Sequence, residues 1–256
     1  MQNDKINFSL IIPIGLMLFS FFFGAGNLIF PPVLGQMAGD NIGWGMLGFC
    51  LSGVGFPLLG VLAMAMKQSD NPDSIAMPMH PLYARAVTIL CALAIGPLFA
   101  IPRTAAVSFD TGIHSLLPAS CEAIGLPVYT VFFFVLTYFF SINPSKIIGH
   151  IGKFLSPMLL ICLAVLVVCV FVNPTGSLKM PNPDFAASPF FRGFQEGYNT
   201  MDLLAAILFG SITIKAIEAQ GITDKKVLTK LCSYAGLIAA FFLAIIYAAL
   251  AYTGAL

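Results

Sequence analysis

The residues best suited to bind a small charged molecule lie where the chain should be most uniformly apolar. No charged side chain occurs from Ile6 to Gly39, yet Gly24-Ala25-Gly26-Asn27 interrupts this stretch. A continuous helix of that length would reach roughly 50 Å at about 1.5 Å per residue, whereas a hydrocarbon core is about 30 Å thick. We therefore predict that the helix breaks at the glycines. Irregular backbone at membrane depth is tolerated only where protein encloses it, so the break predicts a binding site.

The predicted break offers groups of both polarities. The free N–H groups at the start of the second half-helix favour an anion such as a substrate carboxylate. The carbonyl groups that end the first half-helix, near Phe22 and Phe23, favour a cation, and Asn27 adds a neutral oxygen for Na⁺. The alternative is that the glycines only permit a kink or close packing, with Pro31-Pro32 marking the end of the helix.

A second polar stretch, Glu196 to Asp202, precedes a half-length apolar run. Its hydroxyl and carbonyl oxygens suit an ammonium group or Na⁺ in a second unwound segment, and Asp202 is a candidate for protonation. The same residues also match an external loop in which Thr200 or Asp202 caps a helix that begins at Leu203. The sequence leaves these two interpretations open.

A third stretch, Gly96 to Thr104, places Arg103 deep in an apolar segment. Arginine at the centre of a membrane helix costs roughly 2.5–3.5 kcal/mol on insertion scales, so Arg103 is expected to face the bundle or a wet vestibule. Asp110, two turns later, is a candidate partner. A gating role and a structural ion pair or interfacial arginine are both compatible with this pattern.

The composition predicts an integral membrane protein. Charged residues make up 9% of the 256 residues and hydrophobic residues 59%, and the mean hydropathy is +0.94, against about 25% charged residues in soluble domains. The net charge of +1 gives no reason to expect nucleic acid as a partner. The six cysteines form no CxxC pair, so we expect neither a disulfide nor a metal site beyond Na⁺.

Long stretches of low charge predict seven membrane spans. Their ranges are Ile6 to Gly39, Ile42 to Met66, Ala86 to Leu117, Ala123 to Ser145, Phe154 to Val172, Phe194 to Ile214 and Leu231 to Thr253. The second span is rich in small residues, and Gly48 and Ser52 have the spacing that lets a neighbouring helix approach closely.

The lysines and arginines predict a cytoplasmic N-terminus. With that orientation, only Lys179 and Arg192 lie outside. The inner segments hold the other basic residues that flank the spans, which are Lys5, Lys67, Arg85, Lys146, Lys153, Lys215, Lys225, Lys226 and Lys230. The two interrupted spans, the first and the sixth, then enter the membrane in opposite senses, as inverted five-helix repeats require.

Three motifs in order resemble the bacterial branched-chain amino-acid:cation symporter family. They are GAGN-(I/L)-IFPP, matched by Gly24 to Pro32, GPLFA-x-PRTA-x-VSF, matched by Gly96 to Phe109, and GY-x-TMD, matched by Gly197 to Asp202. The resemblance implies an all-α, broken-helix transporter with inverted repeats, of the superfamily that includes the bacterial leucine transporter.

The resemblance also implies roles for single residues. The Ala25 and Gly26 amides, next to Gly24, would meet the substrate carboxylate, and Asn27 would help to bind Na⁺ together with the carbonyl group of Phe22. Carbonyl groups around Tyr198, Thr200 and Met201 would meet the ammonium group, and Thr200 would also contact the ion. Asp202, Arg103 and Asp110 are the candidates for proton transfer or gating.

Family members have about twelve spans, whereas this chain stops at Leu256, after the seventh predicted span. We therefore expect a first repeat at residues 1–172, an external loop at 173–193 and the start of the second repeat at 194–256. The expected function is uptake of leucine, isoleucine and valine with Na⁺ or H⁺ across the bacterial cytoplasmic membrane, without another cofactor.

Two alternatives to a competent transporter remain. One is a non-transporting fragment or assembly partner, with a partner chain supplying further helices, because rocking motion needs both repeats. The other is an intramembrane serine protease, which needs a serine and a histidine within hydrogen-bond reach. Ser52-Gly53 is a poor match to its nucleophile motif, and no histidine falls in the middle of a span, so we do not expect an enzyme.

Overall fold

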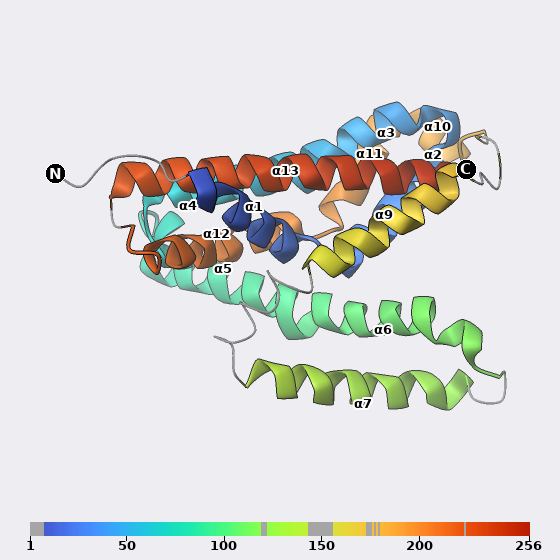
Figure 1. Ribbon diagram of the computed structural model, residues 1–256, viewed down its shortest axis with the longest axis horizontal. Helices are drawn as coiled ribbons and strands as arrows, with labels where there is room; N and C mark the ends of the chain where they lie inside the picture. The colour runs from blue at the N-terminus through green and yellow to red at the C-terminus, as the bar shows by residue number, and fades with distance from the viewer. Residues whose placement is uncertain are drawn as a thin grey trace.

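The computed structural model describes residues 8–118, 122–142, 156–172, 176, 178, 180–222 and 224–256, and every regular element in these ranges is helical (Figure 1). The α-helices are α1 (Phe8–Phe22), α2 (Ala25–Ala38), α3 (Ile42–Cys50), α4 (Phe56–Lys67), α5 (Pro81–Leu93), α6 (Ala100–Gly112), α7 (Glu122–Ser141), α9 (Ser156–Val172), α10 (Pro183–Ala187), α11 (Pro189–Tyr198), α12 (Asp202–Glu218) and α13 (Lys225–Ala255). The shorter turns are η1 (Gly39–Asn41), η2 (Leu51–Gly55), η3 (Pro72–Ile75), η4 (Ala94–Leu98) and η5 (His114–Leu116). The prediction of an all-α protein is confirmed.

The first predicted span is broken where the glycines stand. Helix α1 ends at Phe22 and α2 begins at Ala25, so that Phe23 and Gly24 separate them. Gly24 adopts an extended conformation, with φ −117° and ψ −170°. Pro31 and Pro32 lie inside α2, which continues to Ala38. The break therefore comes from the glycine segment, and the proline pair does not end the helix.

The glycine-rich second span packs closely on α11. A Cβ added at Gly48 would overlap the Phe190 carbonyl oxygen and lie 2.7 Å from the Phe194 nitrogen, so only glycine permits this crossing. The buried Ser52 hydroxyl donates to the Phe194 carbonyl at 2.6 Å. On the opposite helix, a Cβ at Gly193 would overlap the backbone of α3. The prediction of close helix packing at Gly48 and Ser52 is confirmed.

The third span begins earlier than predicted, at Pro81 rather than Ala86, and bends in its middle. Gly96 has φ −82° and ψ −115°, which is not helical, and Pro97 follows it inside η4. Proline removes a backbone donor and clashes with the preceding turn, which accounts for a kink here. As a result α5 and α6 form a bent rod, and α7 packs against α6 at one side of the molecule (Figure 1).

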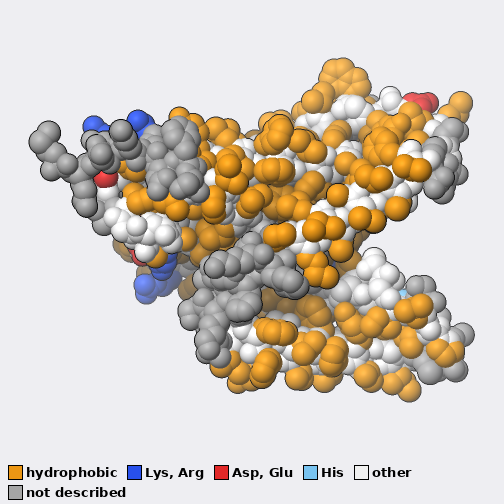
Figure 2. Space-filling view, viewed as in Figure 1, with side chains coloured by type: hydrophobic (Ala, Val, Ile, Leu, Met, Phe, Trp, Pro, Cys, Tyr) orange, Lys and Arg blue, Asp and Glu red, His pale blue; other side chains and the backbone are white. Residues whose placement is uncertain are grey.

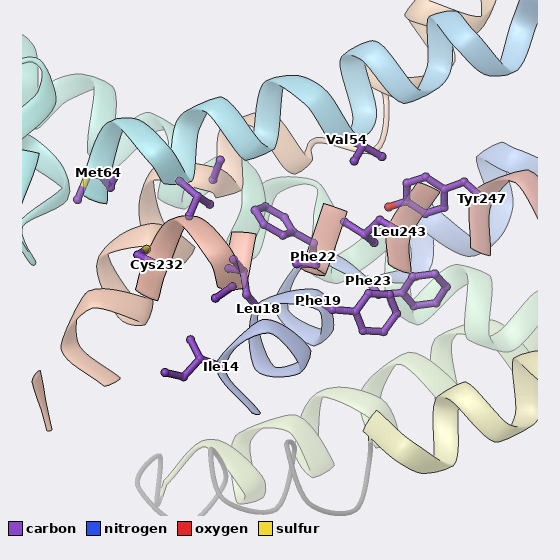
Figure 3. Packing of buried hydrophobic residues seen from close by; sticks show 14 of the residues in the cluster. Ile14, Leu18, Phe19, Phe22, Phe23, Val54, Met64, Cys232, Leu243 and Tyr247 are labelled. Carbon is purple, nitrogen blue, oxygen red and sulfur yellow. The ribbon is translucent and has the colours of Figure 1, made fainter. Parts of the chain in front are cut away.

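The core lies around α1 and the middle of α13. Phe19, Phe23, Leu243 and Tyr247 are buried there, and their side chains gather between the two helices in Figure 3. The Phe19 and Phe23 rings stack at 5.4 Å, and Phe23 also stacks on Tyr247 at 6.3 Å. Such aromatic contacts hold the end of α1 against α13, so the break that follows α1 is fixed in position.

Four described helical segments are long and apolar enough to cross a membrane. They are Ala25–Lys67, Pro81–Gly112, Ile124–Ser141 and Lys225–Ala255, and α11 with α12 forms a further candidate that is bent by 45°. Shorter apolar helices occupy Leu10–Phe22 and Pro157–Val172. The exposed surface of the described helices is largely apolar (Figure 2). Together with the long apolar helices, this surface confirms a multi-pass integral membrane protein. The count of seven spans, the inverted repeats and the boundaries of the two repeats stay predictions.

The sixth predicted span begins earlier than its sequence range, because α11 starts at Pro189 rather than Phe194. The preceding range, predicted as an external loop, contains the short helix α10 and the first turn of α11. Proline at the first position of both helices suits a helix start, since its missing N–H needs no partner there.

Basic side chains gather at one end of the bundle, where α4 and α12 end and α13 begins (Figure 2). The Lys215 ammonium group lies 3.7 Å from Asp70, and the Gln68 amide donates to the Lys225 carbonyl at 3.3 Å. This clustering agrees with the predicted cytoplasmic end, although the orientation in a bilayer stays a prediction.

Candidate functional site

The two helix breaks face one another across a cavity of about 100 Å³. The break between α1 and α2, the break between α11 and α12, and the region from η4 to α6 all contribute to its wall. The lining includes Phe22, Gly24, Ala25, Gly26, Asn27, Arg103, Thr200, Met201 and Asp202. The three sequence motifs, which lie far apart along the chain, therefore meet in one place.

Asn27 closes the start of α2. Its Oδ1 accepts a hydrogen bond from the Gly24 backbone N–H at 3.1 Å, while the Asn27 backbone N–H donates to the Gly24 carbonyl at 3.1 Å. The first amides of a helix, here those of Ala25 and Gly26, have no acceptor within the helix. They carry the positive end of the helix dipole, so this end of the cavity favours an anion.

A buried polar cluster connects this break to the start of α12. The Asn27 Nδ2 donates to Asp202 Oδ2 at 2.6 Å and also contacts the Tyr247 hydroxyl group. The Tyr247 hydroxyl donates to the same carboxylate oxygen at 3.2 Å. All three side chains are at most 4% exposed. Because a buried carboxylate is stable only with such donors, the cluster holds the two breaks and α13 in a fixed arrangement.

The start of α12 is an unusual turn. Met201 occupies the N-cap position in the left-handed conformation, with φ 67°, and its own side chain makes no capping hydrogen bond. The Thr200 hydroxyl donates to the Gly197 carbonyl at 2.8 Å and accepts from the Asp202 amide at 3.4 Å. Neither Thr200 nor Asp202 therefore occupies the N-cap position, although Thr200 does contact the first amide of α12. Non-glycine residues in this conformation are strained and concentrate at functional sites, so the turn itself marks the break as a candidate site.

Arg103 reaches across the cavity to the second break. Its Nη1 donates to the Asn199 carbonyl at 3.0 Å and its Nη2 to the Thr200 carbonyl at 3.4 Å. Its Cζ lies 5.3 Å from the centre of the Phe30 ring, a cation–π contact from α2. Arg103 therefore faces the bundle, as predicted.

Asp110 does not pair with Arg103. Its side chain is exposed, and the described residues contain no ion pair between the two. Asp110 lies two turns beyond Arg103 on α6, about 10 Å along the helix axis, and does not line the cavity that contains Arg103. The candidate pairing of Asp110 with Arg103 is therefore wrong, and carbonyl groups bind the guanidinium instead.

Tyr198, a predicted site residue, lies outside the cavity, whereas Tyr247, which was not predicted, belongs to the buried cluster. Tyr198 is 49% exposed and lies outside the cavity lining, and its carbonyl accepts from the Met201 amide at 3.1 Å. Tyr247 was not among the predicted site residues, although it is fully buried beside Asp202. Its signal in the sequence was a hydroxyl group well inside an apolar span, where a polar atom needs a partner.

Ser52 has a structural role. Its buried hydroxyl donates to the Phe194 carbonyl, and the two histidines in the described ranges lie at element boundaries, His80 before α5 and His114 in η5. The third, His150, lies outside the described residues. A serine that supports a helix crossing in this way does not meet the geometry of a nucleophile and its base.

A family model described as branched-chain amino acid transport protein matches residues 8–256. The branched-chain amino acid permease BrnQ of Bacillus subtilis (strain 168) is 45% identical over 99% of this chain and 58% of its own length. The permease BraB of the same organism is 43% identical over 95% of the chain and 55% of its own length. The permease BrnQ of Escherichia coli (strain K12) is 39% identical over 94% of the chain and 54% of its own length.

The chain thus spans a little over half the length of these curated relatives. No solved structure matches it. The relatives are permeases by name, which confirms the prediction that the chain is not an enzyme. The match of the family model over nearly the whole chain confirms the resemblance drawn from the three motifs. The chain belongs to the family of branched-chain amino acid transport proteins.

Proposed function

We propose that the chain forms the substrate-binding part of a secondary active transporter for leucine, isoleucine and valine in the bacterial cytoplasmic membrane. The observation that carries this proposal is the cavity between two opposed helix breaks, with the helix amides of the first break on one side and the backbone carbonyl groups of the second break on the other. A zwitterion needs both kinds of group at a short separation. The names of the relatives supply the class of substrate.

In this proposal the carboxylate lies against the amides of Ala25 and Gly26, and the ammonium group meets the carbonyl of Thr200. The apolar side chains at the cavity wall, Phe22 and Phe209, enclose the aliphatic group. Their rings pack edge to face at 5.4 Å, which leaves a wall without polar atoms on that side. A hydrophobic pocket with a few convergent polar groups is the usual form of a small-molecule site.

The coupling ion is proposed to bind beside the same break. Asn27 Oδ1 uses one lone pair for the Gly24 amide and keeps a second for Na⁺. The carbonyl group of Phe22 and the Thr200 hydroxyl are the other proposed ligands. Asp202 is the residue that would carry a proton if H⁺ replaces Na⁺, since it is the buried carboxylate of the cluster.

Equilibrium binding tests this proposal. The purified chain in lipid nanodiscs should bind radiolabelled leucine, with competition by isoleucine and valine and none by lysine or glutamate. Titrations in NaCl, in choline chloride and at several pH values identify the ion, because only the coupling ion should tighten binding. Failure of leucine to bind under every ion and pH condition would refute the proposed site.

Uptake into proteoliposomes separates a transporter from an assembly partner. A competent transporter should accumulate leucine under an inward Na⁺ or H⁺ gradient, and Asn27→Ala should abolish the accumulation. A chain that binds leucine but needs a partner chain should show binding without gradient-driven uptake.

The predicted cytoplasmic N-terminus can be tested in the same vesicles. Cysteines placed singly near Lys215 or near Arg192 should be labelled by an impermeant reagent from opposite sides. Labelling of both from one side would contradict the proposed orientation.

A further inference from the structure

The Arg103 guanidinium group, a cation, lies in the wall of the cavity. Arg103 donates to the carbonyl groups of Asn199 and Thr200, and the second of these is the group that the proposed function assigns to the substrate ammonium. A carbonyl that holds a guanidinium at 3.4 Å cannot meet an ammonium group in the same direction. Arg103 and the ammonium group therefore compete for the same oxygen.

The same guanidinium covers the anion-binding side. A Cβ added at Gly26 would lie 2.8 Å from Arg103 Nη2 and 3.3 Å from Cζ, so the guanidinium rests directly on the backbone of the first turn of α2. Phe30, one turn further along α2, provides a ring face at 5.3 Å. One side chain therefore bridges both breaks across the cavity.

The Arg103 guanidinium does not use all of its hydrogen-bond donors. Arg103 Nε is buried and has no hydrogen-bond partner among the described residues. Its two hydrogen bonds go to neutral carbonyl groups, and no carboxylate forms an ion pair with it in the described part of the chain. Guanidinium groups bind carboxylates through two parallel hydrogen bonds, and such charge-assisted bonds are roughly twice as strong as neutral ones. An entering carboxylate would therefore offer Arg103 a better partner than the carbonyls it holds.

We propose that Arg103 is a specificity-determining residue that occupies the ammonium site of the empty cavity and moves onto the carboxylate of an entering amino acid. The inference rests on the proposed function. A zwitterion provides both new partners in this exchange. Its carboxylate binds the Arg103 guanidinium, and its ammonium group binds the Thr200 carbonyl that Arg103 has left. An amine without a carboxylate would displace the partly buried Arg103 guanidinium from its carbonyl acceptors and offer it no new acceptor, which is costly. An acid without an ammonium group would pair with Arg103 and leave the carbonyl vacant.

Two leucine analogues test the exchange. The first, 3-methylbutylamine, is leucine without its carboxylate, and the second, 4-methylpentanoate, is leucine without its ammonium group. Their affinities are measured by displacement of radiolabelled leucine from the chain in nanodiscs, for wild type, Arg103→Gln and Arg103→Lys. Arg192→Gln is the matched control, since Arg192 is an exposed arginine on α11 and does not line the cavity.

We expect Arg103→Gln to change the two analogues in opposite directions. The amine should bind about three-fold more tightly, because Arg103 no longer occupies the Thr200 carbonyl. The acid and leucine should each lose about ten-fold in affinity. Arg103→Lys should keep part of the acid binding, and Arg192→Gln should change nothing. Equal losses for all three ligands, or no change in any of them, would show that Arg103 is only structural and would overturn the inference.

Wild-type protein provides a second test that needs no variant, which matters if Arg103→Gln does not fold, as size-exclusion chromatography would show. Wild type should bind 3-methylbutylamine at least about ten-fold more weakly than leucine. Equal affinities would overturn the inference while leaving the proposed site intact. Absence of leucine binding to wild type would instead overturn the proposed function, and the inference with it.

Discussion

The Tyr247 hydroxyl group provides a direct test of the buried cluster, because it can be removed without changing the shape of the core. Tyr247→Phe deletes the donor to Asp202 Oδ2 and the contact with Asn27. The ring remains, together with its packing on Phe23 at 6.3 Å and on Phe49 at 5.3 Å. Any loss of stability therefore reports on the hydrogen bonds and not on a cavity.

The expected magnitude follows from what the substitution leaves behind. Asp202 is 4% exposed, so water does not replace the lost donor, and its carboxylate keeps the Asn27 amide as a side-chain donor. Leaving a buried acceptor without one of its partners costs about 1–3 kcal/mol. With a shift of about 2–4 °C per kcal/mol for chains of this size, a loss of about 2 kcal/mol corresponds to roughly 4–8 °C in melting temperature.

The assay compares unfolding of wild type, Tyr247→Phe and Tyr234→Phe in mixed detergent micelles. Tyr234 is the matched control, since it lies on the same helix, is 45% exposed and has no hydrogen bond among the described residues. It should unfold like wild type. Combining Tyr247→Phe with Asp202→Asn gives the coupling between the two groups, which should reach about 1 kcal/mol for side chains in direct contact. Unchanged stability of Tyr247→Phe, or a coupling near zero, would refute the cluster.

Two further predictions use pairs of glycines. Gly26→Ala should weaken leucine binding about ten-fold, or roughly 1.4 kcal/mol, because its Cβ would project toward Arg103 into the space proposed for the substrate carboxylate, whereas a Cβ at Gly24 would meet only Asn27 Oδ1 at 3.7 Å. Gly24→Ala should therefore bind leucine as tightly as wild type does. Equal leucine affinities of Gly24→Ala and Gly26→Ala in a radioligand assay would contradict this reasoning. Gly48→Ala should lower the free energy of unfolding by about 1–3 kcal/mol through overlap with α11. Gly43→Ala is the control on the same helix, because a Cβ added at Gly43 has no atom within 4 Å, and it should leave the free energy of unfolding unchanged or raise it slightly. If Gly48→Ala is as stable as Gly43→Ala in detergent unfolding, the crossing of α3 and α11 tolerates a side chain.

The breaks in the first and sixth predicted spans could be predicted from local chemistry. Gly24 and Gly26 in an uncharged run too long for one helix indicate an interruption, and the structure places it between Phe22 and Ala25. The polar run before Leu203 predicted either a break or a cap, because both use the same residue types. The structure contains both features, since the left-handed Met201 separates α11 from α12 and the Thr200 hydroxyl accepts a hydrogen bond from the Asp202 amide.

The partners of the site residues could not be predicted in the same way. Periodicity along α6 places Arg103 and Asp110 on one face, yet the guanidinium binds the carbonyl groups of Asn199 and Thr200 and not Asp110. Tyr247 joins Asn27 and Asp202 only because α13 passes behind both breaks. Such contacts join residues far apart in the chain, and spacing along one helix carries no information about them.

The sequence by itself determined the helical class, the membrane environment and the interruption at Gly24, because composition, hydrophobic length and backbone permissiveness are properties of consecutive residues. It also contained the three motifs that identify the family. Only the tertiary structure decided that the two breaks face one cavity, that Asp202 is held by Asn27 and Tyr247, and that Arg103 fills the space between the breaks. These are packing outcomes, since each depends on how separate helices cross and on which buried polar atoms must find partners where water cannot reach.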